Sequence, residues 1–292
     1  MHFWDRRRFD YAWLAGAGPA LERDFGPDDL APELAPLVES GPVSLVFVQA
    51  DCRSNQGAAE AAWVHGLAAA GAPVLAVVAH ASLERGDDCA AELDELVREA
   101  PLVSGVRRLL QDEPPGFVTD ASLAAGVRLL ASRGLTMDLC VRQHQLDEVA
   151  ELVEGCPDVL FVLDHLGKPR IADEELGAWA TDISRIAALP NVRCKLSGLL
   201  SEAPPERRTS TALRPWLDHA LGAFGPERCM FGSDWPVLTG AGGYDQWHEI
   251  VLGAISGLTE AERNRVLSGT AAATYDPVNR AARAKDSCHG SD

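Results

Sequence analysis

The stretch LFVLDHLG, residues 160–167, has the composition of a buried β-strand that ends at polar groups. Leu, Phe and Val fill its first half, as they do in strands that are covered on both faces. Asp164 and His165 follow at once, and Gly167 ends the stretch. Much of this pattern recurs in six further apolar runs, at residues 43–50, 74–80, 104–110, 135–142, 192–198 and 229–236.

The amphipathic stretches between these runs predict helices. Strands that alternate with helices indicate parallel pairing through right-handed crossovers. A doubly wound open sheet would place a glycine-rich phosphate-binding turn after an early strand, but QADCRSNQG (residues 49–57) lacks that pattern. We therefore predict an α/β (β/α)8 TIM barrel, whose eighth strand only the N-terminus could supply. The predicted helices are residues 57–70, 88–99, 122–132, 145–154, 174–188 and 215–224.

The bulk composition is that of a globular protein in one domain. Of the 292 residues, 47% are hydrophobic and 24% are charged, which suffices for a substantial core. We expect a single barrel domain over residues 1–282 and a disordered tail over residues 283–292. The seven scattered cysteines include no CxxC pair, so we expect reduced, buried thiols.

Charge and hydropathy limit the partners of the chain. The net charge of −17 argues against nucleic acid, because phosphate binding needs concentrated Lys and Arg. No apolar run reaches 18 residues, which argues against a membrane span. The N-terminus lacks the pattern of a signal peptide, so we expect a cytoplasmic protein.

Polar residues stand at the end of nearly every apolar run. In β/α barrels the carboxyl ends of the strands carry the chemistry, so this ring of residues predicts a functional site. Asp234, between Ser233 and Trp235, is the strongest candidate, since its carboxylate can bind a metal or take a proton from water; its alternative is a turn or helix-capping aspartate. The full set is Gln49, His80, Arg107, Arg142 with His144, Asp164 with His165, Lys195 with Ser197, and Asp234.

Several of these residues allow a second interpretation. Strand alternation places Asp164 and His165 on opposite faces, and we expect His165 to face the pocket. Lys195 either faces the pocket or extends outward, because lysine is rarely buried without a partner. Arg107 can grip a carbonyl or carboxylate, or it can form outer ion pairs. His144 lines the mouth of the pocket or belongs to an ordinary helix start.

Three late motifs resemble the sugar-lactonase branch of the amidohydrolase-related superfamily, which includes fuconolactonases and rhamnonolactonases. They are VLDHLGKP (residues 162–169), CKLSGLLSE (residues 194–202) and MFGSDWPV (residues 230–237). VQAD (residues 48–51) and GVRRLLQDEP (residues 105–114) resemble further blocks of the family. The resemblance covers almost the whole chain before the tail, and it implies a small-molecule sugar lactone as substrate.

Members of this family begin with a strand that carries a His-x-His pair followed by Phe-Trp. MHFWD (residues 1–5) matches only the second histidine of the pair, at His2, together with the residues that follow. The resemblance therefore implies that MHFWD is the end of barrel strand one and that the first strand is largely missing. A start codon chosen too late and a genuine truncation both remain open.

The resemblance also implies a mechanism of water attack on the lactone carbonyl. Asp234 would be the general base, and His165 and His2 would polarise the carbonyl, directly or through a divalent metal. His2, His165 and Asp234 would hold that metal, zinc or manganese, if one is bound; a metal-independent reaction is the alternative. The residues expected to bind the substrate are Arg107, His144, Lys195, Gln49 and Trp235.

Two rival functions remain at this point. One is a metal-dependent decarboxylase of the same superfamily, which would release carbon dioxide from an unsaturated carboxylate. The other is a degenerate barrel that binds a sugar acid without turning it over. The sequence does not name the sugar, and it leaves a homo-oligomer open.

Overall fold

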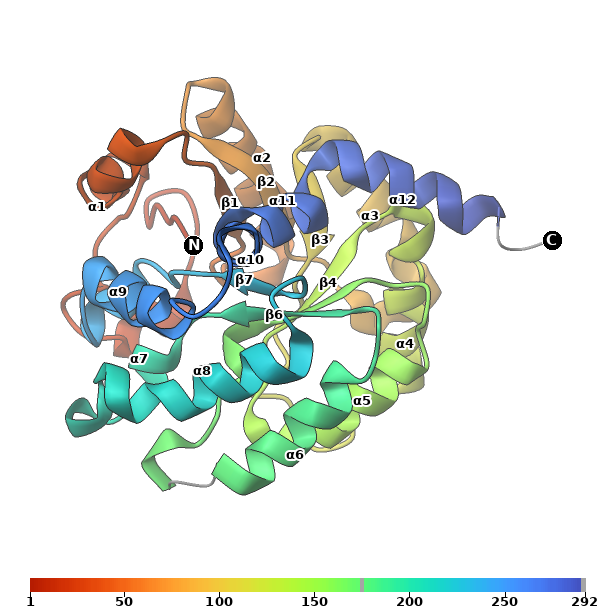
Figure 1. The fold of residues 1–292 in the computed structure, drawn as a ribbon. Helices are drawn as coiled ribbons and strands as arrows, with labels where there is room; N and C mark the ends of the chain where they lie inside the picture. Colours follow the sequence, from red (N-terminus) through yellow and green to blue (C-terminus); the bar gives the residue numbers. More distant parts are fainter. Residues whose placement is uncertain (174–175, 290–292) are drawn as a thin grey trace.

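The structure is a computed structural model that describes residues 1–173 and 176–289. At its centre lies a curled seven-stranded parallel sheet whose strands follow one another in chain order (Figure 1). This arrangement confirms the predicted α/β class with parallel strands. The strands are β1 (Leu45–Val48), β2 (Val74–Ala79), β3 (Val103–Val106), β4 (Thr136–Leu139), β5 (Phe161–Leu163), β6 (Val192–Leu196) and β7 (Cys229–Phe231).

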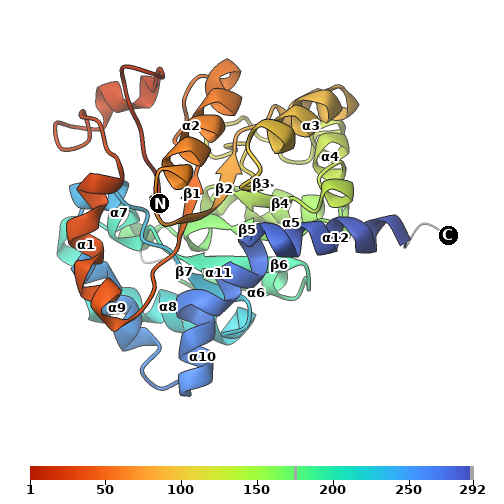
Figure 2. The same ribbon diagram turned by 90° about the horizontal axis from the view of Figure 1, so that it is seen from above.

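Helices surround the sheet and cover its outer face (Figure 2). Their starts follow local sequence signals: at α4, for example, the Asp120 carboxylate accepts hydrogen bonds from the backbone N–H groups of Ser122 and Leu123. The helices are α1 (Pro27–Ser40), α2 (Gly57–Ala69), α3 (Ala90–Glu99), α4 (Ala121–Arg128), α5 (Leu146–Glu154), α6 (Leu176–Ala187), α7 (Leu199–Glu202), α8 (Ser210–Phe224), α9 (Tyr244–Ala254), α10 (Glu260–Asn264), α11 (Thr270–Tyr275) and α12 (Pro277–His289).

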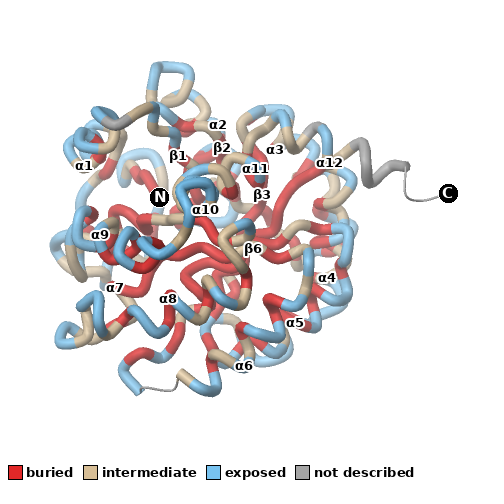
Figure 3. The backbone as a smooth tube through the Cα atoms, viewed as in Figure 1, coloured by how far each residue is buried: buried red, intermediate tan, exposed pale blue. Residues whose placement is uncertain are grey.

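The strands form the most buried part of the molecule, and the exposed residues lie mainly on the outer surfaces of the helices (Figure 3). Phe47, Met137 and Phe161 on three strands are completely buried. The thiols follow the sequence prediction, because Cys52, Cys89, Cys140, Cys156, Cys194 and Cys229 are all free and buried. Cys288 lies outside the residues whose side chains the structure describes.

The first two residues lie between the two ends of the sheet. The amino group of Met1 donates a hydrogen bond to the Val46 carbonyl, and the Val48 N–H donates to the Met1 carbonyl. The His2 N–H donates to the Trp235 carbonyl, just beyond β7. In the described part of the chain no ladder joins β7 directly to β1. The start of the chain is thereby bound to both edges.

The last helix extends into the stretch that we predicted to be a disordered tail, which begins at residue 283. α12 continues from Pro277 past Arg283 to His289. The Arg283 guanidinium donates two hydrogen bonds to the Gly134 carbonyl, which ties this helix to the turn before β4. None of the helices in the described residues is both long and apolar enough to cross a bilayer.

Candidate active site

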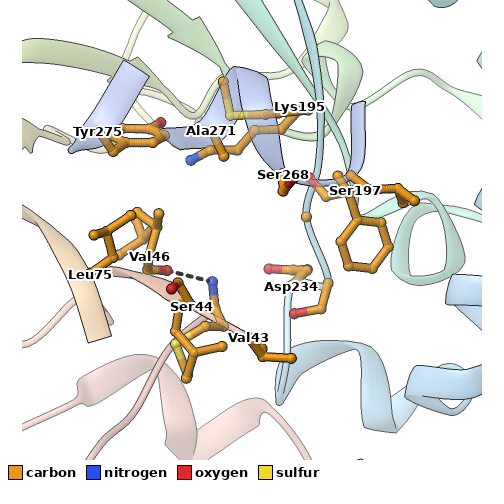
Figure 4. A pocket seen from close by; sticks show the side chains of 18 of the residues that line it. Val43, Ser44, Val46, Leu75, Lys195, Ser197, Asp234, Ser268, Ala271 and Tyr275 are labelled. Atoms are coloured by element: carbon orange, nitrogen blue, oxygen red, sulfur yellow. Dashed lines mark hydrogen bonds between the residues drawn. The ribbon is translucent and has the colours of Figure 1, made fainter. Parts of the chain in front are cut away.

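A cavity of about 390 Å³ lies between β1 and β7 and reaches the carboxyl ends of the strands. β1, β7, α1 and α11 contribute mainly apolar side chains to its wall. Figure 4 shows Lys195, Ser197 and Asp234 around this space. The polar residues that line it near the strand ends include His2, Arg107, Asp164, His165, Lys195, Ser197, Ser233 and Asp234.

Asp234 follows the end of β7 in an unusual backbone conformation. Its φ is 59°, in the left-handed region that a non-glycine residue rarely adopts, and such residues cluster at functional sites. Oδ1 of Asp234 lies 3.4 Å from Nε2 of His2 and 3.7 Å from Nε2 of His165. Burial would raise the pKa of Asp234, but the two imidazoles lower it well below its usual range. Asp234 is therefore a carboxylate flanked by two rings.

A backbone carbonyl group fixes the orientation of the His2 ring. Its Nδ1 lies 2.8 Å from the Val48 carbonyl oxygen, which can only accept a hydrogen bond. In the neutral ring Nδ1 therefore carries the proton and Nε2 is bare, whereas the protonated ring also donates from Nε2 to Asp234 over 3.4 Å and so lowers the pKa of that carboxyl. Burial lowers the pKa of His2, which favours this neutral form.

His165 reaches the cavity through a break in the strand geometry. β5 ends at Leu163, and His165 and Leu166 have φ values of 52° and 54°. Because the chain leaves the strand here, Asp164 and His165 both line the cavity, and the expectation that only one of them faces inward is wrong. Nδ1 of His165 lies 2.9 Å from Oγ of Ser197. Burial lowers the pKa of His165 to about 4, so the ring is neutral near pH 7.

A buried ion network lies next to these groups. Nζ of Lys195 is 2.5 Å from Asp138 and 2.7 Å from Asp164, and Arg107 donates to Asp164 over 3.0 Å. The Tyr275 hydroxyl donates to Asp138 over 2.7 Å. Burial disfavours the charge on Lys195, but the two carboxylates raise its pKa above the usual range. Lys195 therefore faces inward and is paired, as a buried lysine must be.

Three residues expected to contact the substrate lie elsewhere in the described structure. Gln49 is buried between the Arg107 carbonyl (3.4 Å) and the Asp51 N–H (2.5 Å), where it supports the loop after β1. Trp235 is 2% exposed and packs edge-on against aromatic rings of the core. His144 is exposed on a short turn. None of the three is among the residues given above as lining the cavity.

Two members of the site were not predicted. Asp138 lies on β4 in the run TMDL, and Tyr275 ends α11. The Asp138 carboxylate in an apolar strand is a visible signal, because a buried charge requires a partner. Tyr275 gives no such signal, since its partner lies 137 residues away.

Two pairs of atoms at Asp234 have the spacing of metal ligands. Adjacent ligands of a tetrahedral zinc ion with bonds of roughly 2.0–2.1 Å are about 3.4 Å apart. The separations of 3.4 and 3.7 Å from Asp234 to the two Nε2 atoms match this edge length. Among the described residues, however, the group whose ligand atoms all lie within 4.8 Å of one another is Cys140 with Asp164 and His165. Asp164 of that group already pairs with two cationic side chains.

Comparison with known proteins adds an independent finding. The family model described as amidohydrolase matches residues 1–276. An L-fucono-1,5-lactonase from Burkholderia multivorans is 36% identical over 288 residues, which cover 94% of this chain and 93% of that protein. An L-rhamnono-gamma-lactonase from Scheffersomyces stipitis is 27% identical over 202 residues, 61% of this chain and 60% of that protein. A crystal structure of a Burkholderia multivorans amidohydrolase with bound zinc has 37% identity and a TM-score of 0.81, covering 94% and 96% of the two chains.

Proposed function

This chain belongs to the amidohydrolase family, and from that premise we propose that it opens sugar-acid lactones by water attack, with L-fucono-1,5-lactone as the leading substrate. The observation that carries the proposal is the approach of two imidazole Nε2 atoms to one buried carboxylate oxygen, His2 and His165 on Asp234. A close relative named for a lactone hydrolase supplies the substrate class.

Asp234 would activate the attacking water. Its lowered pKa keeps it ionised at every working pH, so it can accept a proton at once. A carboxylate with a low pKa is a weak base alone, but the bare Nε2 of His2 at 3.4 Å offers the same proton a second acceptor. The pair can therefore hold the proton while the tetrahedral intermediate forms.

His165 would stabilise the charge that develops on the lactone carbonyl oxygen. A neutral ring that donates from Nε2 gives a hydrogen bond that strengthens as the oxygen becomes negative. When the ring C–O bond breaks, the alkoxide leaving group takes the proton held by Asp234 and His2. The product is the open-chain hydroxy acid, and the site returns to its starting protonation state.

In an alternative form of the site, His2, His165 and Asp234 would hold a divalent cation, and His165 would then carry its proton on Nδ1 instead of Nε2. Bound there, the cation would supply Lewis-acid polarisation of the carbonyl. Arg107 and Lys195 line the cavity while they pair with Asp164, so they would offer N–H groups to the hydroxyls of the sugar ring.

We further propose that the sheet is the wall of an eight-stranded barrel in which Met1 and His2 take the place of the end of the first strand. The support is their backbone hydrogen bonds, to Val46 and Val48 on one side and to Trp235 on the other. Amide hydrogen exchange tests this proposal. The N–H groups of His2 and Val48 should exchange as slowly as those inside the sheet, and rapid exchange at either would contradict it.

The activity is tested with a panel of aldonolactones followed by a pH indicator, with spontaneous ring opening subtracted. L-Fucono-1,5-lactone and L-rhamnono-gamma-lactone head the panel because relatives are named for them. We expect acid release well above the uncatalysed rate for at least one of them. Binding of the lactones, seen as thermal stabilisation, without acid release would instead identify a barrel that binds sugar acids but does not turn them over.

A further inference from the structure

We propose that Ser197 is a positioning residue that fixes the tautomer of His165, by donating its hydroxyl hydrogen to Nδ1 and so keeping the ring proton on Nε2. The inference rests on the proposed function for its catalytic meaning, but its structural content can be measured without any substrate. Ser197 lies directly after β6, the strand that carries Lys195.

The contact between the two side chains is short and enclosed. Oγ of Ser197 lies 2.9 Å from Nδ1 of His165, and Ser197 is 1% exposed. Gly198, at φ 75°, passes so close to the ring that a Cβ there would lie 2.6 Å from Nδ1. Any larger residue would displace the imidazole. The backbone and the hydroxyl together hold the ring in one place.

Donor and acceptor accounting assigns the direction of the hydrogen bond. Nε2 of His165 faces Asp234, a carboxylate that only accepts. At 3.7 Å this contact is electrostatic and not a hydrogen bond, and it favours a neutral His165 with its single proton on Nε2, which leaves Nδ1 as an acceptor. The Ser197 hydroxyl, which can donate or accept, must then donate.

His2 has the opposite arrangement. The Val48 carbonyl can only accept, so the proton of His2 sits on Nδ1 and its Nε2 is bare. The two rings next to Asp234 thus present different atoms to the same space, a donor from His165 and an acceptor from His2. A carbonyl oxygen that becomes negative needs the donor, and a water that loses a proton needs the acceptor. Ser197 therefore determines which histidine serves the carbonyl.

Tautomers can be read directly by long-range proton–nitrogen NMR of the full-length chain labelled with ¹⁵N-histidine, in EDTA so that no cation competes for Nε2. Comparison with the His2→Asn and His165→Asn variants assigns the two rings. We expect the Nε2–H pattern for His165 and the Nδ1–H pattern for His2. An Nδ1–H pattern for His165 in the unsubstituted protein would overturn the proposal, whether or not the protein hydrolyses lactones.

Kinetics of Ser197→Ala test the catalytic consequence. Loss of a residue that orients a reacting group costs roughly 10- to 100-fold in activity. We expect that loss in kcat with KM within about twofold, a weakened Nε2–H preference in the NMR spectrum, and an unchanged Tm. The control Ser184→Ala, on an exposed helix surface, should change none of these. A Ser197→Ala enzyme with the kcat of the unsubstituted protein would refute the positioning role.

Discussion

Nε2 of His2 and Oδ1 of Asp234 lie 3.4 Å apart, although 232 residues separate them in the chain. The contact depends on both edges of the sheet, because His2 is hydrogen-bonded to Val48 at the end of β1 and to Trp235 beyond β7. The proposed catalytic arrangement is therefore a product of the whole fold. Variants at Asp234 should therefore lose activity, whereas variants in the buried ion network of Lys195 should lose stability.

Replacing Asp234 with Asn should abolish turnover and leave the fold intact. The amide keeps the size of the carboxylate but cannot take a proton from water, and general-base catalysis contributes roughly 10²- to 10⁴-fold. Acid release in the indicator assay should fall by that factor, while the circular dichroism spectrum and Tm stay close to those of the unsubstituted protein. Asp158→Asn, at an exposed position, is the matched control. Near-normal activity in Asp234→Asn would remove Asp234 from the mechanism.

Zinc should raise the thermal stability of the protein through His2, His165 and Asp234. A ligand that binds only the folded state at 100 times its Kd stabilises by about 2.7 kcal/mol. Differential scanning fluorimetry with and without zinc should show a higher Tm, and EDTA should reverse it. His165→Asn should lose the effect. If Cys140→Ser loses it and His2→Asn retains it, the cation sits instead in the group of Cys140, Asp164 and His165.

Removing only the positive charge of Lys195 should cost more stability than removing it together with the negative charge of Asp138. Lys195→Met leaves Asp138 and Asp164 facing each other without their shared cation, and loss of one buried partner costs about 3–5 kcal/mol. Lys195→Met with Asp138→Asn removes one positive and one negative charge together. Urea unfolding should therefore show the double variant to be more stable than Lys195→Met alone. Additive losses would mean that Lys195 and Asp138 are not energetically coupled.

Glu60 should make the protein less stable as the pH rises. This carboxyl on α2 accepts a hydrogen bond of 2.9 Å from the Tyr11 hydroxyl, and burial raises its pKa from 4.5 to about 7. The folded protein therefore keeps a proton that the unfolded chain loses above pH 4.5, so the stabilisation is full below that pH and is lost as the pH rises through 7. The shift corresponds to about 3 kcal/mol.

Glu60→Gln provides the measurement, because the amide imitates the protonated carboxyl. The free energy of unfolding from urea titrations should fall between pH 5 and pH 8 in the unsubstituted protein and fall less in this variant. Glu249→Gln, at an exposed position on α9, serves as a control for the loss of one negative charge. Parallel pH profiles for the unsubstituted protein and Glu60→Gln would show that Glu60 is ionised in the folded state.

Trp235→Phe should weaken the fold and leave substrate recognition unchanged. The indole packs edge-on against Phe3 and Phe25, with ring centroids 6.2 and 5.4 Å away. A smaller ring leaves part of that space empty, at a cost of about 1–3 kcal/mol. KM for the lactone should stay within about twofold while the urea midpoint falls. A large rise in KM at unchanged stability would return Trp235 to the substrate site.

The sequence was sufficient to predict the strands and several of the polar residues that line the cavity at their ends. Apolar runs mark the parallel sheet, and Asp234, His165 and Lys195 stand where each run stops. Simple alternation failed at Asp164, because positive φ values after β5 turn two successive side chains toward the same cavity. Pattern alone cannot reveal such a backbone change, which depends on the surrounding packing.

The sequence also did not reveal which residues at the strand ends line the cavity. Gln49 and Trp235 stand at strand ends, yet one supports a loop and the other fills the core. Tyr275 belongs to the site only because α11 packs against β7 and β2, where its hydroxyl reaches Asp138 on β4, and no local pattern encodes that contact. Position along the chain predicts which residues approach the site, but packing decides which of them face it.

The hydrogen bonds that tie His2 to residues on either side of the sheet also set a condition on protein synthesis. A growing chain releases His2 long before Asp234, because 232 residues separate them. Until then the histidine has no carboxylate opposite it, and the edge beside β1 has no partner from β7. A nascent fragment that stops before Asp234 therefore lacks the proposed site, and contacts over such a distance make folding slow and exposed to aggregation.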